Sequence, residues 1–123
     1  MARPLAQSKR VLVVDDDPGI RTLLHVALED EGYSVDSATN GREALDKIHH
    51  DQPSAILLDL MMPVMDGWSF LAACRRDGLC RDVPIIVMSA GAWAGTMMGL
   101  GTDAFIAKPF DLDVLLGTLA TLC

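Results

Sequence analysis

The sequence predicts a doubly wound α/β domain built on a five-stranded parallel sheet. Short apolar runs that carry β-branched residues alternate with amphipathic stretches of helical period, the pattern of parallel strands joined by helices. The first such run, Arg10–Val14, is apolar as expected of a strand that helices cover on both faces. A chain of 123 residues, half of them hydrophobic, is long enough for one domain with its own core.

The first strand, Arg10–Val14, leads directly into the first predicted helix. Asp17 is placed to cap this helix, and Pro18 stands at its first position, where a missing N–H costs nothing. Gly32 ends the helix. The apolar residues that follow the rhythm of one helix face, and that we expect to face the core, are Ile20, Leu23, Leu24, Ala27 and Leu28.

The remaining elements continue the alternation. Further strands are expected at Tyr33–Ala38, Ala55–Asp59, Pro84–Ser89 and Ala104–Ala107. Further helices are expected at Arg42–His50, where Asn40 is the cap, from about Trp68 to Arg76, and from about Leu112 to Leu122. This alternation suits a flavodoxin-like sheet of strand order 2-1-3-4-5, whose switch point lies beside the first strand.

The segment between the fourth and fifth strands is expected to form a short or irregular fourth helix. Its sequence, GAWAGTMMGLG, contains four glycines, and each destabilises a helix by roughly 0.5–1 kcal/mol relative to alanine. Trp93, Met97 and Met98 would then offer an apolar docking patch. We expect residues 1–8 to form a flexible N-terminal extension and residues 9–123 to form the domain.

Charge and hydropathy exclude several classes of protein. A net charge of −7 and a pI near 4.6 leave no basic patch, so we expect no direct DNA binding. No apolar run approaches the roughly 20 residues of a membrane span, and the N-terminus lacks the apolar stretch of a signal peptide. A cytoplasmic protein without membrane contact is the expectation.

The three cysteines do not form a recognisable motif. Cys74, Cys80 and Cys123 are widely spaced and contain no CxxC pair, which argues against a disulfide framework and against a zinc site. We interpret them as reduced, small hydrophobic residues.

Charged residues stand where the predicted strands end. Asp15 and Asp16 follow the first strand, Asp59 ends the third, and Lys108 follows the fifth. Because the carboxyl ends of parallel strands share one edge of a sheet, these residues are expected to meet in one acidic pocket. Clustered carboxylates repel one another unless a hard cation lies among them, and Mg2+ is the usual cation when a phosphoryl group is involved.

Four motifs stand in order at the ends of the first, third, fourth and fifth strands: VLVVDDDP, AILLDLMMPVMDGW, PIIVMSA and FIAKPF. With these motifs the chain resembles, over nearly its full length, a response-regulator receiver domain of two-component signalling, of the stand-alone single-domain type. The resemblance implies a phosphorylatable signalling protein that switches its binding to partners.

The resemblance implies that Asp59 is the phosphoacceptor. Its carboxylate would take a phosphoryl group from a phosphohistidine of a sensor histidine kinase or histidine phosphotransfer protein, or from a small phosphodonor. Asp16 would bind Mg2+ directly, Asp15 directly or through a water, and Asp59 and the backbone carbonyl of Met61 would complete the protein ligands. Mn2+ is expected to substitute for Mg2+.

The resemblance also implies how phosphorylation would be sensed. Ser89 and Lys108 would bind phosphoryl oxygens through a hydroxyl and an ammonium group. Three carboxylates, one ammonium group and one Mg2+ make a neutral site, and phosphorylation adds a charge of roughly −1.5 to −2. Phe105 occupies the position of the family's aromatic switch. Its inward movement would alter the face formed by the fourth helix, the fifth strand and the fifth helix, to which an unidentified downstream protein would bind.

Two features of the loop after the third strand lead to further expectations. We interpret Asp66–Gly67 as a turn and helix cap rather than as part of the chemistry. Met61 places an apolar side chain beside the expected acyl phosphate, where it cannot orient a water molecule. Autodephosphorylation is therefore expected to be slow for the family.

Three classes of function remain open. The leading hypothesis is a receiver that catalyses its own phosphotransfer and autodephosphorylation and is not a turnover enzyme. The alternative is an interaction module that keeps the receiver fold but works without phosphorylation. The third class, a flavin-binding protein or an aspartyl phosphatase, is remote. The acidic pocket would repel a flavin phosphate, and such a phosphatase would need a second acid at position 61.

Overall fold

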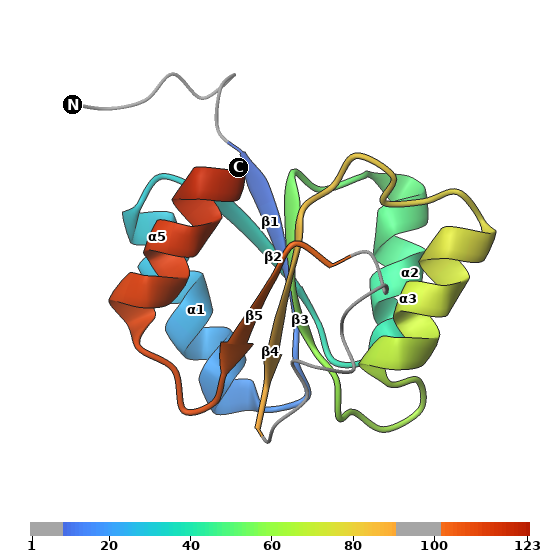
Figure 1. Cartoon of the computed structure of the whole chain (residues 1–123), viewed down its shortest axis with the longest axis horizontal. Coiled ribbons are helices and arrows are strands. Elements are labelled where there is room, and N and C mark those ends of the chain that lie inside the picture. Colours follow the sequence, from blue (N-terminus) through green and yellow to red (C-terminus); the bar gives the residue numbers. More distant parts are fainter. Residues whose placement is uncertain (1–8, 91–101) are drawn as a thin grey trace.

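The computed structural model describes residues 9–90 and 102–123. Within them, a sheet of five parallel strands lies between two layers of helices (Figure 1), and its strand order is β2-β1-β3-β4-β5. The predicted fold class and strand order are therefore confirmed. The predicted extension 1–8 and the predicted irregular fourth helix, with Trp93, Met97 and Met98, lie outside the described residues.

The elements follow the predicted alternation closely. They are β1 (Arg10–Val14), α1 (Pro18–Asp30), β2 (Ser34–Ala38), α2 (Gly41–His50), β3 (Ala55–Asp59), α3 (Gly67–Arg76), β4 (Ile85–Ser89), β5 (Ala104–Ala107) and α5 (Leu112–Leu122). Tyr33 and Pro84, which were predicted as strand residues, precede β2 and β4. Gly32 has a φ of 95°, so the turn that ends α1 extends up to Tyr33.

Short polar side chains fix the first residues of the helices. Asp17 accepts a hydrogen bond from the backbone N–H of Gly19 at 2.8 Å, and Pro18 follows at the first helical position, as predicted. Asn40 caps α2 in the same way through the N–H of Glu43, at 2.9 Å. These caps place the N-termini of the helices beside the carboxyl edge of the sheet, where the strands end (Figure 1).

The sheet divides the core into two parts. Helices α1 and α5 cover one face and helices α2 and α3 cover the other (Figure 1). Leu24 and Leu28 of α1 are fully buried, as predicted. Leu23 is 46% exposed, so its prediction as a core residue is wrong: it lies at the rim of an apolar hollow that is also lined by Pro109 and Phe110.

None of the helices within residues 9–90 and 102–123 combines the length and the apolar character that crossing a membrane requires.

Candidate functional site

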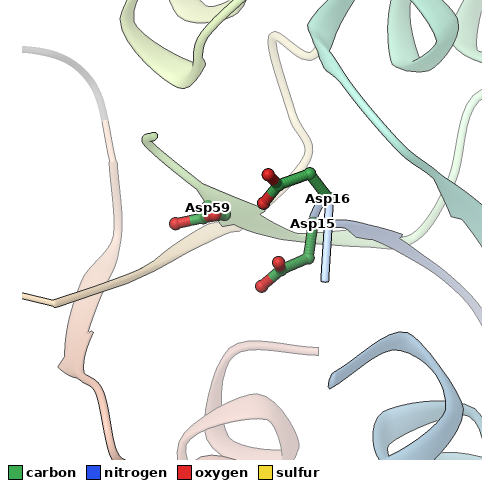
Figure 2. Close-up of side chains that lie close together, drawn as sticks. All are labelled: Asp15, Asp16 and Asp59. Atoms are coloured by element: carbon green, nitrogen blue, oxygen red, sulfur yellow. The ribbon is translucent and has the colours of Figure 1, made fainter. Parts of the chain in front are cut away.

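Three carboxylates from the ends of β1 and β3 meet at the carboxyl edge of the sheet. The two strands are hydrogen-bonded neighbours with Val14 opposite Leu58, so Asp15 and Asp59 follow at the same level. Figure 2 shows the side chains of Asp15, Asp16 and Asp59 close together, and one ligand atom from each lies within 4.8 Å of the others. The predicted juxtaposition of these residues is present in the structure.

Asp15 is the innermost carboxylate of the site and is fully buried. Its Oδ1 accepts a hydrogen bond from the backbone N–H of Asp17 at 2.9 Å, and its Oδ2 accepts one from Nζ of Lys108 at 2.6 Å. Asp16, by contrast, is exposed. The pair therefore offers one fixed carboxylate inside the site and one that faces the solvent above it.

Asp59, the last residue of β3, is 5% exposed. Its Oδ1 accepts a hydrogen bond from the N–H of Leu60 at 2.9 Å and lies 3.6 Å from Nζ of Lys108. Burial, followed by the negative charge of Asp15, raises the pKa of Asp59 to about 6, and Lys108 and two backbone N–H groups oppose this shift only in part. Lys108 and the backbone N–H groups therefore do not fully offset the negative charge of the ionised Asp59 carboxylate.

Lys108 and Ser89 come to the site from β5 and β4. Ser89 lies opposite Ala107 in the sheet, and the backbone N–H of Lys108 donates to the carbonyl of Ser89 at 2.8 Å. The Ser89 hydroxyl is buried and donates to the carbonyl of Ala90 at 3.2 Å. The peptide bond between Lys108 and Pro109 is cis. All of the predicted polar side chains thus stand at the same edge of the sheet.

The loop from β3 to α3 closes tightly over the backbone of Asp59. Asp66 caps α3 by accepting the N–H of Ser69 at 2.8 Å, which agrees with its interpretation as a turn and cap. Gly67 does more than continue the turn. A Cβ at this position would lie 2.5 Å from the carbonyl oxygen of Asp59 and 2.8 Å from Cα of Leu60.

Gly41, at the start of α2, supports the other side of the same loop. Its backbone N–H donates to the carbonyl of Met65 at 2.8 Å, and a Cβ here would lie 2.9 Å from that carbonyl oxygen. Sequence reasoning missed the role of both glycines. The DG pair at 66–67 gave a local signal for a turn, but the close approach of the two backbones is set by the tertiary structure.

The predicted switch residue Phe105 is partly buried on β5. Its ring packs with Trp68 against Leu60 and Val87, which are both fully buried. Phe105 therefore contacts a cluster that includes the residue directly after Asp59. Met61, the next residue in the loop, has an exposed side chain.

Comparison with known proteins decides the family of the chain. The family model described as the response regulator receiver domain matches residues 11–120. The chain belongs to this family. It is accordingly a receiver domain of two-component signalling, a system that implies kinase partners.

Several full-length proteins are similar to this chain over about half of their own length. Response regulator MprA of Mycobacterium tuberculosis is 44% identical over 119 residues, which cover 94% of this chain and 50% of that protein. Response regulator Rre1 of Synechocystis sp. is 39% identical, with the same coverage. The chain thus spans about half the length of these curated relatives.

Solved structures of two other response regulators superimpose on nearly all of the chain. The chemotaxis protein CheY4 of Vibrio cholerae has a TM-score of 0.87 at 33% identity, covering 94% of this chain and 99% of that one. The response regulator TrrA of Thermotoga maritima, solved in complex with Mg2+ and BeF, has a TM-score of 0.84 at 34% identity, with the same coverage. The fold of the receiver domain is therefore shared almost from end to end.

Proposed function

We propose that Asp59 accepts a phosphoryl group from a kinase phosphohistidine in a Mg2+-dependent reaction. The observation that carries this proposal is the convergence of three carboxylates and one lysine at the end of β3, where the Asp59 carboxylate is buried but under-compensated. We further propose that residues 9–123 form the receiver domain and that residues 1–8 form an N-terminal extension to it.

The residues present suit a hard divalent cation. Asp15, Asp16 and Asp59 supply carboxylate oxygens within a small space, and the backbone carbonyl of Met61 would add a neutral oxygen ligand. The bound Mg2+, or Mn2+ in its place, would neutralise charge and orient the phosphoryl oxygens. The complex of the relative TrrA with Mg2+ and BeF supports this assignment.

The chain itself would supply the nucleophile and its positioning. The Asp59 carboxylate attacks phosphorus, the bond from phosphorus to the imidazole nitrogen breaks, and the imidazole leaves with its electron pair. The N–H of Leu60 holds one carboxylate oxygen of Asp59 in place. Lys108, whose ammonium group lies 2.6 Å from Asp15 and 3.6 Å from Asp59, has three donors and can pair with a transferred phosphoryl oxygen.

The added charge would then shift two side chains. Phosphorylation adds a charge of roughly −1.5 to −2 at Asp59, which attracts Lys108 and the hydroxyl of Ser89. Ser89 would exchange its hydrogen bond to the carbonyl of Ala90 for one to the phosphoryl group. The movement would open space for Phe105, so that a population shift on β5 and α5 reports phosphorylation to a downstream protein.

The partners follow from this chemistry. A sensor histidine kinase or a histidine phosphotransfer protein would supply the phosphoryl group. The acidic net charge of the chain supports a protein rather than DNA as its direct downstream partner. The absence of DNA binding, the cytoplasmic location and the lack of membrane contact remain predictions.

Intact mass after incubation with a small phosphodonor tests the proposal. Wild type should gain one phosphoryl group with Mg2+ and none without it, and Asp59→Asn should gain none under either condition. Asp66→Asn is the matched control, because asparagine also caps a helix and the substitution lies in the same loop. If wild type fails to gain mass, the alternative function, an interaction module that works without phosphorylation, is favoured.

A further inference from the structure

A pair of buried thiols lies at the end of the sheet opposite the acidic site. Cys74 is in the last turn of α3 and Cys80 is in the loop before β4, and their sulfur atoms are 3.1 Å apart. Both residues are free cysteines, 3% and 8% exposed. They are buried, as expected of small hydrophobic residues, but their spacing in the sequence did not predict that they touch.

The turn that ends α3 brings the two thiols together. The N–H of Leu79 donates to the carbonyl of Cys74 at 2.8 Å and the N–H of Gly78 donates to Arg75 at 3.3 Å, which is a Schellman turn with Gly78 at a φ of 69°. Cys80 then takes a left-handed φ of 60°, which is uncommon for a residue other than glycine. These two residues reverse the chain, so that Sγ of Cys80 returns to the last turn of α3.

The pair borders a cavity that a small oxidant can enter. Cys74 and Cys80 line a cavity of about 370 Å3 together with the arginines Arg75 and Arg81. The hydrogen bond shared with Cys80, together with burial, raises the pKa of Cys74, and the same hydrogen bond lowers the pKa of Cys80. Cys80 is the more exposed of the two residues, 8% against 3% for Cys74, so we expect its sulfur to meet an oxidant first.

We propose that Cys74 and Cys80 form a redox modification site, which closes to an intramolecular disulfide when it reacts with hydrogen peroxide. The Cys80 thiol gives up its proton, the thiolate attacks one peroxide oxygen, the O–O bond breaks, and the leaving hydroxide takes up that proton, so that a sulfenic acid and water result. The thiol of Cys74 then attacks the sulfenic sulfur, the S–O bond breaks, and a second water leaves. Two thiols and one peroxide thus give one disulfide and two waters, with both sulfurs oxidised and both peroxide oxygens reduced.

The closure needs only a short movement of side chains. The sulfur atoms would approach from 3.1 Å to the roughly 2.05 Å of a disulfide bond. The bond would tie the C-terminal end of α3 to the loop that enters β4, because those are the segments that carry the two cysteines. The site shares no residue with the acidic cluster, so this proposal does not rest on the phosphorylation of Asp59.

Thiol counting on the full chain tests the proposal. The reduced protein is treated with hydrogen peroxide, the peroxide is removed, and the chain is unfolded and alkylated with N-ethylmaleimide. Wild type should lose two hydrogen atoms and then add one alkyl group, at Cys123, in place of three before treatment. Trypsin, which cuts after Arg75 and Arg81, should release residues 48–75 joined to residues 77–81, and a reducing agent should separate them.

Cysteine variants identify the bonded pair. Cys123→Ser should form the same bond as wild type and leave no thiol to alkylate, whereas Cys74→Ala and Cys80→Ala should lose the joined peptide. The proposal is overturned if treated wild type still alkylates at three sites. It is also overturned if single cysteines oxidise to sulfinic or sulfonic acid instead, or if the bond involves Cys123. The wild-type result decides the matter even if a variant folds poorly.

Discussion

The two loops that flank α3 are closed in different ways. The loop before the helix, residues 60–66, is held by neighbouring elements: the N–H of Gly67 donates to Leu60 at 2.9 Å, and the N–H of Gly41 donates to Met65 at 2.8 Å. At both glycines another backbone lies within 3 Å of where a Cβ would be. This loop, which carries the segment next to Asp59, therefore depends on the absence of two side chains.

The turn after the helix, residues 77–83, is closed by backbone hydrogen bonds within its own segment. The N–H of Leu79 donates to Cys74 and the N–H of Val83 donates to Cys80, at 2.8 Å and 3.2 Å. Gly78 has a positive φ, but a Cβ there would make only an ordinary contact with the side chain of Arg81. The difference teaches that the backbone of the loop at the acidic site is held in part by another element, α2, whereas the turn after α3 is closed by local backbone hydrogen bonds, so the two should respond unequally to the same substitution.

The largest effect is expected for Gly67→Ala. The new methyl group would meet the carbonyl oxygen of Asp59 at 2.5 Å, and backbone cannot give way as a flexible side chain can. We expect the free energy of unfolding to fall by about 3 kcal/mol, the upper part of the usual range for overpacking. Urea denaturation measures this, and the same displacement should slow phosphorylation of Asp59.

Gly78→Ala is the matched substitution in the other loop. Its Cβ would have Arg81 as nearest neighbour, at 3.7 Å, so the cost comes from the left-handed φ alone. We expect a loss of roughly 1 kcal/mol. Equal losses for Gly67→Ala and Gly78→Ala would show that the two loops are not held differently.

The next effect in size is expected for Asp59→Asn without added divalent cation. The folded pKa of Asp59 is raised from 3.8 to about 6, so its destabilising contribution is absent below pH 3.8, grows between pH 3.8 and pH 6, and is fully present above pH 6. Asparagine can still accept the N–H of Leu60 but carries no charge. We expect it to stabilise the protein at pH 7 by about 2 kcal/mol.

Thermal unfolding with and without Mg2+ provides the check. Mg2+ should raise the Tm of wild type and have much less effect on Asp59→Asn, because the variant has lost one of the proposed ligand groups. Asp82→Asn, which alters an exposed carboxylate in the other loop, serves as the control and should leave both results unchanged. A less stable Asp59→Asn at pH 7 would show that the carboxylate is compensated after all.

The fold and the convergence of the acidic residues could be predicted from the sequence because both depend on the order of strands and helices and on which residues end the strands. Asp15, Asp59 and Lys108 stand at the ends of strands, and parallel pairing brings such ends together whatever the details of packing. The roles proposed for these residues still rest on the family and on the experiments above.

The features that the sequence did not predict depend on distances between residues that are far apart or lie on either side of a turn, and these distances are known only from the structure. The need for glycine at 67 arises where the start of α3 crosses the backbone of Asp59. The contact between Cys74 and Cys80 arises from the left-handed turn after α3. Leu23 has the correct helical spacing for the core, yet it lies at the rim of the covered face.

A smaller effect is expected for Val64→Gly in the loop before α3. Val64 has a φ of 68° and an exposed side chain, so this β-branched residue carries backbone strain without a packing gain. Glycine should relieve the strain and raise the free energy of unfolding by about 1 kcal/mol. Val26→Gly, at an exposed valine inside α1, should instead lower it by roughly 0.3 kcal/mol, because glycine forms helices less readily than valine. Urea denaturation of both variants gives the comparison.

The smallest effect is expected for Met61→Asn, which should shorten the lifetime of the phosphorylated protein severalfold. The exposed apolar side chain of Met61 stands two residues after Asp59 and cannot orient a water molecule, whereas an amide can donate and accept hydrogen bonds. Loss of phosphate is followed by intact mass after the phosphodonor is removed. Met61→Leu keeps an apolar side chain and should match wild type. An unchanged lifetime in Met61→Asn would show that the side chain at this position does not control access of water, and that the loop before α3 acts through its backbone alone.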